Sequence, residues 1–295
     1  MKPLFSIIIP AHNEEDYIED VLVACYAQTF PIALFEIIVV DDGSTDKTRE
    51  IVENFAAIKR DETLNIIKLI HYDTGHSAAF ARNRGTEIAS GEILVFQDAD
   101  CIPHKDLLKN ASKYFNHYDG IATKTLNTKP ASWLQRAVQA QRKTRWEYFE
   151  TKDKILNKDS GINVAIMKKD VFNKLGGFSQ SIFYFEDNDL TKRFFERNYT
   201  ALFASDVIQY HNDPLTIAES LSQCKSIAKG LKIKAKNTKI HSELLIILSS
   251  LLVLTPIIIA LYTFFYSKDL LGSIYFGLLW EIRNLAKLVY FFNQN

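Results

Sequence analysis

The chain has 295 residues, and its 35 lysine and arginine residues balance its 35 aspartate and glutamate residues. A chain of this length can bury a core that needs no disulfide or metal to stabilise it, and its zero net charge gives no electrostatic reason to expect a nucleic-acid partner. The three cysteines, Cys25, Cys101 and Cys224, are far apart and lack metal-ligand spacing, which predicts reduced thiols in a cytoplasmic protein without structural zinc.

Four short apolar runs rich in β-branched residues predict strands in the first hundred residues. They are residues 4–9, 36–40, 65–70 and 93–97. Apolar residues at helical spacing over residues 14–29 predict a helix after the first strand, and Ser44 and Ser77 are candidate N-caps of two more. This alternation predicts an α/β, Rossmann-like fold, with a mostly parallel central sheet and helices on both faces.

A polar segment follows each predicted strand. The segments are Pro10-Ala11-His12-Asn13-Glu14, Asp41-Asp42-Gly43-Ser44, His71-Tyr72-Asp73 and Asp98-Ala99-Asp100. Such residues also serve as turns and helix caps in any protein. However, carboxylates after the first, second and fourth strands would converge on one edge of a parallel sheet, which is where ligands of these sheets bind. We therefore predict a ligand site at this edge.

The sequence after residue 107 is mixed, with a predicted helix over residues 131–149 and a second acidic block at residues 186–189. Residues 244–266 are 23 residues without a charge, close to the roughly 20 that span a bilayer. Six lysines and no acid occupy residues 224–239 just before them, which is a juxtamembrane pattern. We predict a basic juxtamembrane segment at 223–242 and one or two transmembrane or interfacial helices at 243–295; a buried soluble helix is the alternative for 244–266.

These motifs, in this order, resemble glycosyltransferase family 2, inverting transferases of the GT-A fold. The matching segments are Phe5-Ser6-Ile7-Ile8-Ile9-Pro10-Ala11-His12-Asn13-Glu14-Glu15, Val39-Val40-Asp41-Asp42-Gly43-Ser44-Thr45-Asp46, Ala81-Arg82-Asn83-Arg84-Gly85, Asp98-Ala99-Asp100, Glu186-Asp187-Asn188-Asp189-Leu190 and His211. The resemblance implies a GT-A catalytic domain over residues 1–222. Residues 1–100 would form its nucleotide-sugar half and residues 101–222 its acceptor half.

The resemblance also implies which residues bind the donor, a nucleoside-diphosphate sugar for which we expect UDP rather than GDP. They are Pro10, His12, Glu14, Asp41, Asp42, Arg82 and Asp98. The resemblance assigns Glu14 and Asp42 to the nucleoside, with Asp41 as a further candidate, and carboxylates suit ribose hydroxyls and a base N–H. Arg82 resembles the family's basic contact to the donor, and its guanidinium suits diphosphate oxygens; a surface arginine on a helix is the alternative.

A divalent cation, Mg²⁺ or Mn²⁺, is expected to neutralise the leaving diphosphate. By resemblance Asp100 is its direct ligand, and Asp98 contacts the ribose or the water molecules on the metal. His211 is a third metal-side candidate that would favour Mn²⁺, with an ordinary packed histidine as the alternative.

Asp187 matches the second residue of the family's Glu-Asp pair, which makes it the candidate general base for the acceptor hydroxyl. Its alternative is an acid that merely favours the dipole at a helix N-terminus. Processive synthases of the family carry a Gln-x-x-Arg-Trp motif after this pair, whereas here the similar run Arg142-Lys143-Thr144-Arg145-Trp146 comes before it. The departure favours transfer of a single sugar.

The sequence therefore predicts a metal-dependent inverting glycosyltransferase of the hexosyltransferase type. It would move one sugar to a lipid-linked or cell-envelope glycan acceptor, with its catalytic domain on the cytoplasmic face of the cell membrane. Its partners would be the donor, the acceptor and membrane lipids, but no nucleic acid. The alternatives are a processive polysaccharide synthase and a catalytically inactive, membrane-bound subunit that binds nucleotide sugars.

Overall fold

The computed structural model describes residues 3–59, 66–127, 135, 151–182 and 185–212. By its internal contacts the chain divides into two units. The first unit, Met1–Thr125 with Lys152–Asn212, contains nearly all of the described residues. The second unit, Leu126–Thr151 with Asp213–Asn295, lies almost wholly outside them.

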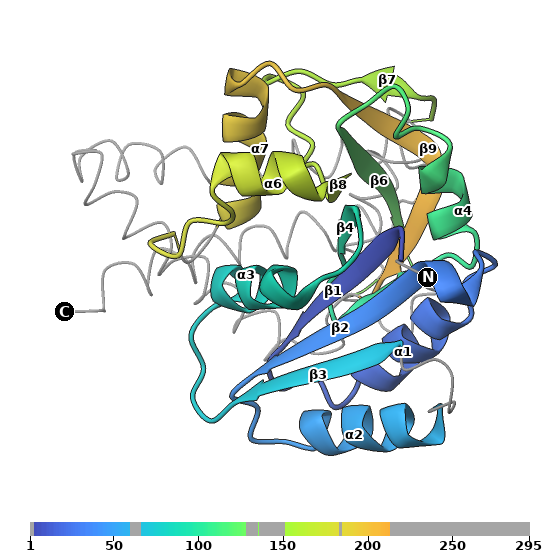
Figure 1. Cartoon of the computed structure of the whole chain (residues 1–295), viewed down its shortest axis with the longest axis vertical. Coiled ribbons are helices and arrows are strands. Elements are labelled where there is room, and N and C mark those ends of the chain that lie inside the picture. The colour runs from blue at the N-terminus through green and yellow to red at the C-terminus, as the bar shows by residue number, and fades with distance from the viewer. Residues whose placement is uncertain (1–2, 60–65, 128–134, 136–150, 183–184, 213–295) are drawn as a thin grey trace, which may run out of the picture. The chain divides into compact units, whose positions relative to one another are not determined.

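The first hundred residues form a parallel half-sheet in the order β3-β2-β1-β4 (Figure 1). Its strands are β1 (Phe5–Ala11), β2 (Phe35–Asp42), β3 (Ile67–Tyr72) and β4 (Ile93–Phe96), and its connections carry α1 (Ile18–Tyr26), the 3-10 turn η1 (Ile32–Leu34), α2 (Thr48–Ile58) and α3 (Ala78–Ile88). All three strand pairs in this half are parallel. The predicted parallel order is therefore confirmed, and the strand bounds agree to within two residues.

The rest of the sheet continues from β4 in the order β8-β6-β9-β5, with β7 beside β9. The strands are β5 (Cys101–Pro103), β6 (Gly120–Asn127), β7 (Lys154–Ile155), β8 (Ile166–Lys168) and β9 (Ala201–His211), and the helices are α4 (Leu107–Ser112), α6 (Lys169–Leu175) and α7 (Glu186–Glu196). The β4–β8, β6–β8, β5–β9 and β7–β9 pairs are antiparallel. The second half thus extends the parallel sheet with antiparallel strands.

Both faces of β1 are covered, which explains why almost the whole strand is apolar. Ile7 and Ile9 belong to a buried cluster with Val21 and Leu22 of α1. Ile8 points to the opposite face because side chains alternate along a strand. There it lies beside Gly85 of α3, where an added Cβ would come within 2.5 Å of the Ile8 Cγ2 atom. Glycine therefore lets α3 approach the sheet closely.

The two candidate N-caps behave differently. The Ser77 hydroxyl accepts a hydrogen bond from the Phe80 N–H at the start of α3, as predicted. The Ser44 prediction is wrong, because α2 begins at Thr48 with Lys47 at the N-cap position. The Ser44 hydroxyl instead accepts a hydrogen bond from the Asn13 N–H, across two loops.

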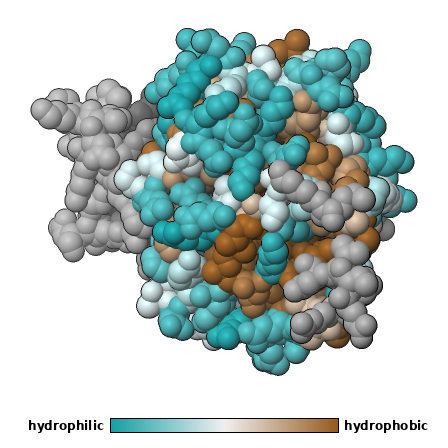
Figure 2. Space-filling model, in the orientation of Figure 1, coloured by the Kyte–Doolittle hydropathy of each residue, from teal (hydrophilic) through white to brown (hydrophobic). Residues whose placement is uncertain are grey.

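The predicted C-terminal segments at 223–242 and 243–295, the helix at 131–149 and the Arg142–Trp146 run all lie outside the described residues. Among the residues that are described, no helix is both long and apolar enough to cross a bilayer. In the face shown in Figure 2, hydrophilic residues cover most of the described surface, and a hydrophobic area lies over β2 and β3.

Candidate active site

A cavity of about 290 Å³ lies at the carboxyl ends of β1, β2 and β4. It is lined by all but one of the residues that we predicted to bind donor or metal: Pro10, His12, Glu14, Asp42, Arg82, Asp98, Asp100 and His211. Asp41 is the exception. Parallel strands bring their carboxyl ends to one edge, so the fold itself gathers these groups from segments far apart in the sequence.

The loop after β1 is joined to the loop after β2 by hydrogen bonds between side chains and main chain. The Asn13 Oδ1 atom accepts a bond of 2.8 Å from the Thr45 N–H, and Asn13 itself has a φ of 58°. The Glu14 N–H donates to the Thr48 hydroxyl at 2.7 Å. These bonds therefore hold Glu14 in the wall of the cavity.

Glu14 has a strongly perturbed acidity. Burial raises its pKa to about 8, and the nearby charges of Asp100, Asp98 and Asp46 add to the rise, while His211 opposes it. At neutral pH and without a cation, the Glu14 carboxyl is therefore mostly protonated, so it can donate a hydrogen bond as well as accept one. A cavity that concentrates carboxylates in this way favours a bound cation or hydrogen-bonding ligand.

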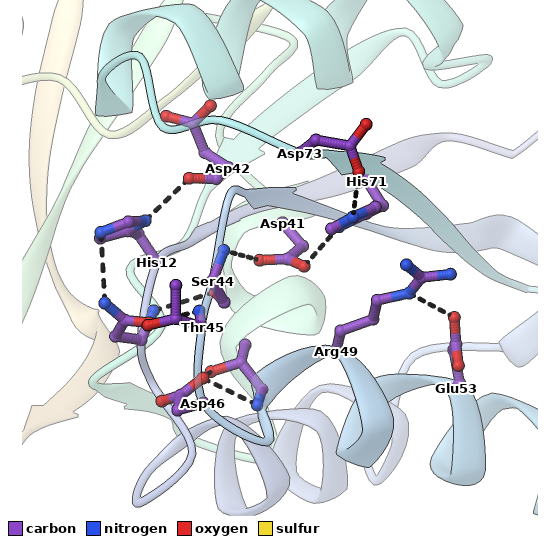
Figure 3. A network of polar contacts seen from close by, with 12 residues as sticks. His12, Asp41, Asp42, Ser44, Thr45, Asp46, Arg49, Glu53, His71 and Asp73 are labelled. Atoms are coloured by element: carbon purple, nitrogen blue, oxygen red, sulfur yellow. Dashed lines mark hydrogen bonds and ion pairs between the residues drawn. The ribbon is translucent and has the colours of Figure 1, made fainter.

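Asp41 is fully buried and has internal partners for its carboxylate (Figure 3). Its Oδ1 atom accepts a 3.1 Å bond from the Ser44 N–H, and its Oδ2 atom lies 2.8 Å from Nδ1 of His71. The other ring nitrogen of His71 is 3.3 Å from Asp73. These contacts tie Asp41 to the loop after β2 and to His71 of β3, and Asp41 does not line the cavity.

Asp42, next in sequence, faces the cavity. Its backbone carbonyl accepts a 2.7 Å hydrogen bond from Nδ1 of His12 (Figure 3). Its carboxylate oxygens lie 2.8 Å and 2.9 Å from the N–H and Nδ1 of His76. The His76 ring stacks on Phe80 at 4.1 Å. Sequence reasoning missed His76, which lies just beyond the polar block after the third strand.

The Asp98-Ala99-Asp100 segment joins β4 to β5, and strand pairing brings His211 to it. In the β5–β9 pair, Cys101 lies opposite His211. The His211 Nε2 atom is 3.4 Å from Asp100 Oδ2, and the Asn212 N–H donates to the Asp100 carbonyl at 3.0 Å. The sequence thus places a carboxylate and an imidazole side by side although 111 positions separate them.

The residues at this point fit a divalent cation. One ligand atom from each of Asp100, Cys101 and His211 lies within 4.8 Å of the others. Carboxylate and imidazole are suitable ligands for Mn²⁺, and Mg²⁺ prefers the oxygen ligands. Cys101 is buried and its soft sulfur suits neither ion. Asp100 and His211 are therefore the candidate ligands, with Asp98 close by in the same cavity wall.

Arg82 of α3 lines the cavity but is also held by two carboxylates. Its Nη2 atom donates to Asp98 at 2.8 Å and its Nη1 atom donates to Glu186 at 2.7 Å. Burial alone would lower the pKa of Arg82, but the two carboxylates raise it above its usual value. The side chain is only 12% exposed, so this arginine is an interior charge and not the surface residue weighed as its alternative.

Asp187 is exposed in the first turn of α7 and does not line the cavity. Its Oδ2 atom accepts a 2.5 Å hydrogen bond from Nδ2 of Asn163. The Asp187 Oδ1 atom accepts a bond from the Asn188 N–H at 2.8 Å. Asn163 was not predicted, because an isolated asparagine carries no recognisable sequence signal. Asp187 is linked to the cavity through its neighbour Glu186, which binds Arg82.

A sequence model described as glycosyl transferase family 2 matches residues 6–176, more than half of the chain. The glycosyltransferase AglE of Haloferax volcanii is 30% identical over 210 residues, which are 71% of this chain and 67% of that protein. The poly(ribitol-phosphate) beta-N-acetylglucosaminyltransferase TarS of Staphylococcus aureus is 36% identical over 115 residues, which are 39% of this chain but 19% of that protein.

Two solved structures share the fold. The crystal structure of TarS residues 1–349 with UDP has a TM-score of 0.56 and 21% identity, and the match covers 98% of this chain and 91% of that one. The mannosyltransferase PcManGT from Pyrobaculum calidifontis, with GDP-Man and Mn²⁺, has a TM-score of 0.59 and 20% identity, covering 98% and 74%.

Proposed function

This chain belongs to glycosyl transferase family 2 and is a glycosyltransferase, and we propose that it is a metal-dependent, inverting enzyme that transfers a single sugar. The donor is a nucleoside-diphosphate sugar, with UDP preferred over GDP. One observation carries the proposal: four acidic side chains, those of Glu14, Asp42, Asp98 and Asp100, line one cavity with His211 at the carboxyl edge of the parallel strands.

Two groups of cavity-lining residues suit two parts of the donor. Asp42 and His12 offer a carboxylate and an imidazole for a base N–H and ribose hydroxyls. Asp100 and His211 would hold Mn²⁺ or Mg²⁺. When bound, the cation supplies Lewis-acid neutralisation of the diphosphate as it leaves. The fold is shared with a UDP complex of TarS and a GDP-Man and Mn²⁺ complex of PcManGT, which supports both expectations.

Asp187 acts as the general base. Inversion is an in-line displacement, so the acceptor hydroxyl attacks the anomeric carbon from the side opposite the leaving diphosphate, and its proton passes to the Asp187 carboxylate. Asn163 donates to one oxygen of that carboxylate and so fixes its orientation. The exposure of Asp187 in the free protein is consistent with a base that meets a separately bound acceptor.

The acceptor is a lipid-linked or cell-envelope glycan at the cytoplasmic face of the cell membrane. TarS is named for a poly(ribitol-phosphate) acceptor, which supports a glycan or polyol-phosphate polymer as the acceptor class. The six lysines before the uncharged residues 244–266 support membrane attachment. On this proposal the C-terminal region brings the catalytic domain to its acceptor.

The test is transfer from UDP-sugars and GDP-sugars with Mn²⁺, using wild type and Asp187→Asn. The variant should bind nucleoside diphosphate normally but transfer about 10² to 10⁴-fold more slowly. Asp170→Asn is the matched control, because Asp170 is an exposed acid in the first turn of another helix. Full activity of Asp187→Asn would exclude this base. If the wild-type protein neither transferred nor hydrolysed any of these donors, the proposed function would be wrong.

A further inference from the structure

Arg82 connects the two halves of the predicted catalytic domain, the nucleotide-sugar half (residues 1–100) and the acceptor half (residues 101–222). Its guanidinium contacts Asp98, which follows β4 in the nucleotide half, and Glu186, the first residue of α7. The partners Arg82 and Glu186 are 104 residues apart in the sequence. Both are well buried, with 12% and 13% of their side chains exposed. Because a buried charge is costly unless it is paired, the Arg82 guanidinium holds Glu186 at this point.

The surroundings of Arg82 are themselves held in place. Its guanidinium carbon lies 5.4 Å above the centre of the Phe178 ring. The main chain of Phe178 is bound at both polar atoms by Asn83, at 2.9 Å each. Gly177 has a φ of 74°, and an added Cβ there would come within 2.8 Å of Asn83 Oδ1. Arg82 and Asn83 of α3 therefore both contact Phe178, in the segment that precedes α7.

The start of α7 has no side-chain cap of its own. Phe185 occupies the N-cap position with a φ of 68°, and its side chain makes no capping hydrogen bond. Serine, threonine, aspartate or asparagine would normally fix a helix start by such a bond. The ion pair between Glu186 and Arg82 instead ties the first residue of this helix to α3. Asp187 is the next residue, so its carboxylate follows the position of Glu186.

We propose that Glu186 is a positioning residue: through Arg82 it sets where the first turn of α7, and hence the base Asp187, lies relative to Asp98 in the donor cavity. This inference rests on the proposed function, in which Asp187 takes the acceptor proton. Its chemical consequence is large, since a displacement of about 1 Å at a reacting group can cost about 10²-fold in rate.

The kinetic test compares Glu186→Gln with wild type. The variant should lower kcat by about 10 to 100-fold and leave the KM for the donor within about twofold, because Glu186 does not line the donor cavity. Glu186→Asp, which keeps the charge, should recover part of the loss. A variant that is merely less stable would not give this split between kcat and KM at a temperature well below unfolding. A rise in donor KM as large as the fall in kcat, or an unchanged kcat, would overturn the proposal.

Glu87→Gln is the matched control. Glu87 pairs with Arg84 on the same helix α3, but both side chains are exposed, at 58% and 37%. Exposed pairs contribute little to stability. This variant should therefore keep wild-type kcat and KM.

A second readout does not depend on turnover. Amide hydrogen exchange in the first two turns of α7 should rise at least about tenfold in both Glu186→Gln and Arg82→Lys. Glu186→Gln removes the charge that pairs with Arg82, and in Arg82→Lys the lysine lacks the forked guanidinium that reaches both carboxylates. Exchange there should stay at the wild-type rate in Glu87→Gln. Unchanged exchange in Glu186→Gln and Arg82→Lys would refute the positioning role, even if the protein turned over no donor. Raised exchange in a protein that transfers no sugar would instead show that only the proposed function is wrong.

Discussion

His211 lies beside Asp100 because β9 ends where β5 begins, and the two residues face one another with Nε2 and Oδ2 3.4 Å apart. The pairing is a product of strand register. Cys101 is opposite His211, so a shift of one residue in β9 would turn the imidazole to the other face of the sheet. The candidate metal position is thus set by backbone hydrogen bonds as well as by the choice of side chains.

Asp100→Asn and His211→Gln should affect the metal differently. Loss of the Asp100 charge should lower transfer by at least about 10²-fold with either ion, since a bound cation is worth several kcal/mol in such reactions. If His211 binds the cation as proposed, His211→Gln replaces its nitrogen ligand by an oxygen and should shift the preference from Mn²⁺ towards Mg²⁺. Titration of the transfer rate with each ion measures both effects. Wild-type metal dependence in both variants would exclude this position, and the exposed Asp20 of α1 offers Asp20→Asn as a control.

Stability should depend on pH through Glu14. Its pKa is about 8 in the folded protein against 4.5 as the ordinary value. Between these values the folded form binds more protons than the unfolded form, so the contribution of Glu14 to the free energy of unfolding falls as pH rises. Glu14→Gln has no such titration, and its Tm should gain on that of wild type between pH 5 and pH 8 without divalent cation. A Tm difference between Glu14→Gln and wild type that stayed constant with pH would contradict this prediction. Glu53→Gln is the control: Glu53 forms an exposed ion pair, and the Tm difference between this variant and wild type should stay constant with pH.

Asp41→Asn and Asp42→Asn should separate stability from binding. Asp41 is fully buried and accepts from Ser44, so its replacement should cost about 1 to 3 kcal/mol in urea unfolding. Asp42 faces the cavity, and its replacement should weaken nucleoside-diphosphate binding by about 10 to 100-fold, the range for hydrogen bonds to charged groups. Calorimetry measures the second effect. If Asp41→Asn kept wild-type stability but bound nucleotide more weakly, Asp41 would be part of the nucleotide-binding site.

Gly43→Ala should destabilise the protein strongly. Gly43 has a φ of 77°, and an added Cβ would collide with the main chain of Thr74 and Gly75. Gly161→Ala is a matched control, since Gly161 also has a positive φ of 63° but an added Cβ there meets no atom within 4 Å. The control should cost only the strain of the backbone, about 1 to 3 kcal/mol. Equal losses in the two variants would show that the loop at Gly75 yields easily.

The first half of the fold could be predicted from the sequence because its signals are local. Apolar strands of four to eight residues and polar segments at their carboxyl ends are adjacent in the chain, and one topological rule then brings the segments together. That is why Glu14, Asp42, Asp98 and Asp100 were identified correctly as neighbours. Strands β5, β7 and β8 could not be found in this way, since two or three residues show no periodicity.

The rest of the site depends on partners that no local pattern reveals. The Arg82–Glu186 and Asn163–Asp187 contacts follow from how α7 packs against the remainder of the unit. Asp41 and Asp42 are identical in type and adjacent, yet alternation along β2 turns their side chains to opposite faces, and only Asp42 lines the cavity. From the sequence, Asp42 was assigned to the nucleoside and Asp41 was a further candidate for the same contact.

The register of β5 and β9 also has a consequence for synthesis on the ribosome. The donor-side carboxylates are made within the first hundred residues, but His211 emerges about 110 residues after Cys101, which is roughly 5 to 20 s at ordinary translation rates. Glu186, the partner of Arg82, also comes late in the chain. The cavity of a nascent chain therefore lacks His211 until β9, the last strand among the described residues, has been made and has paired with β5.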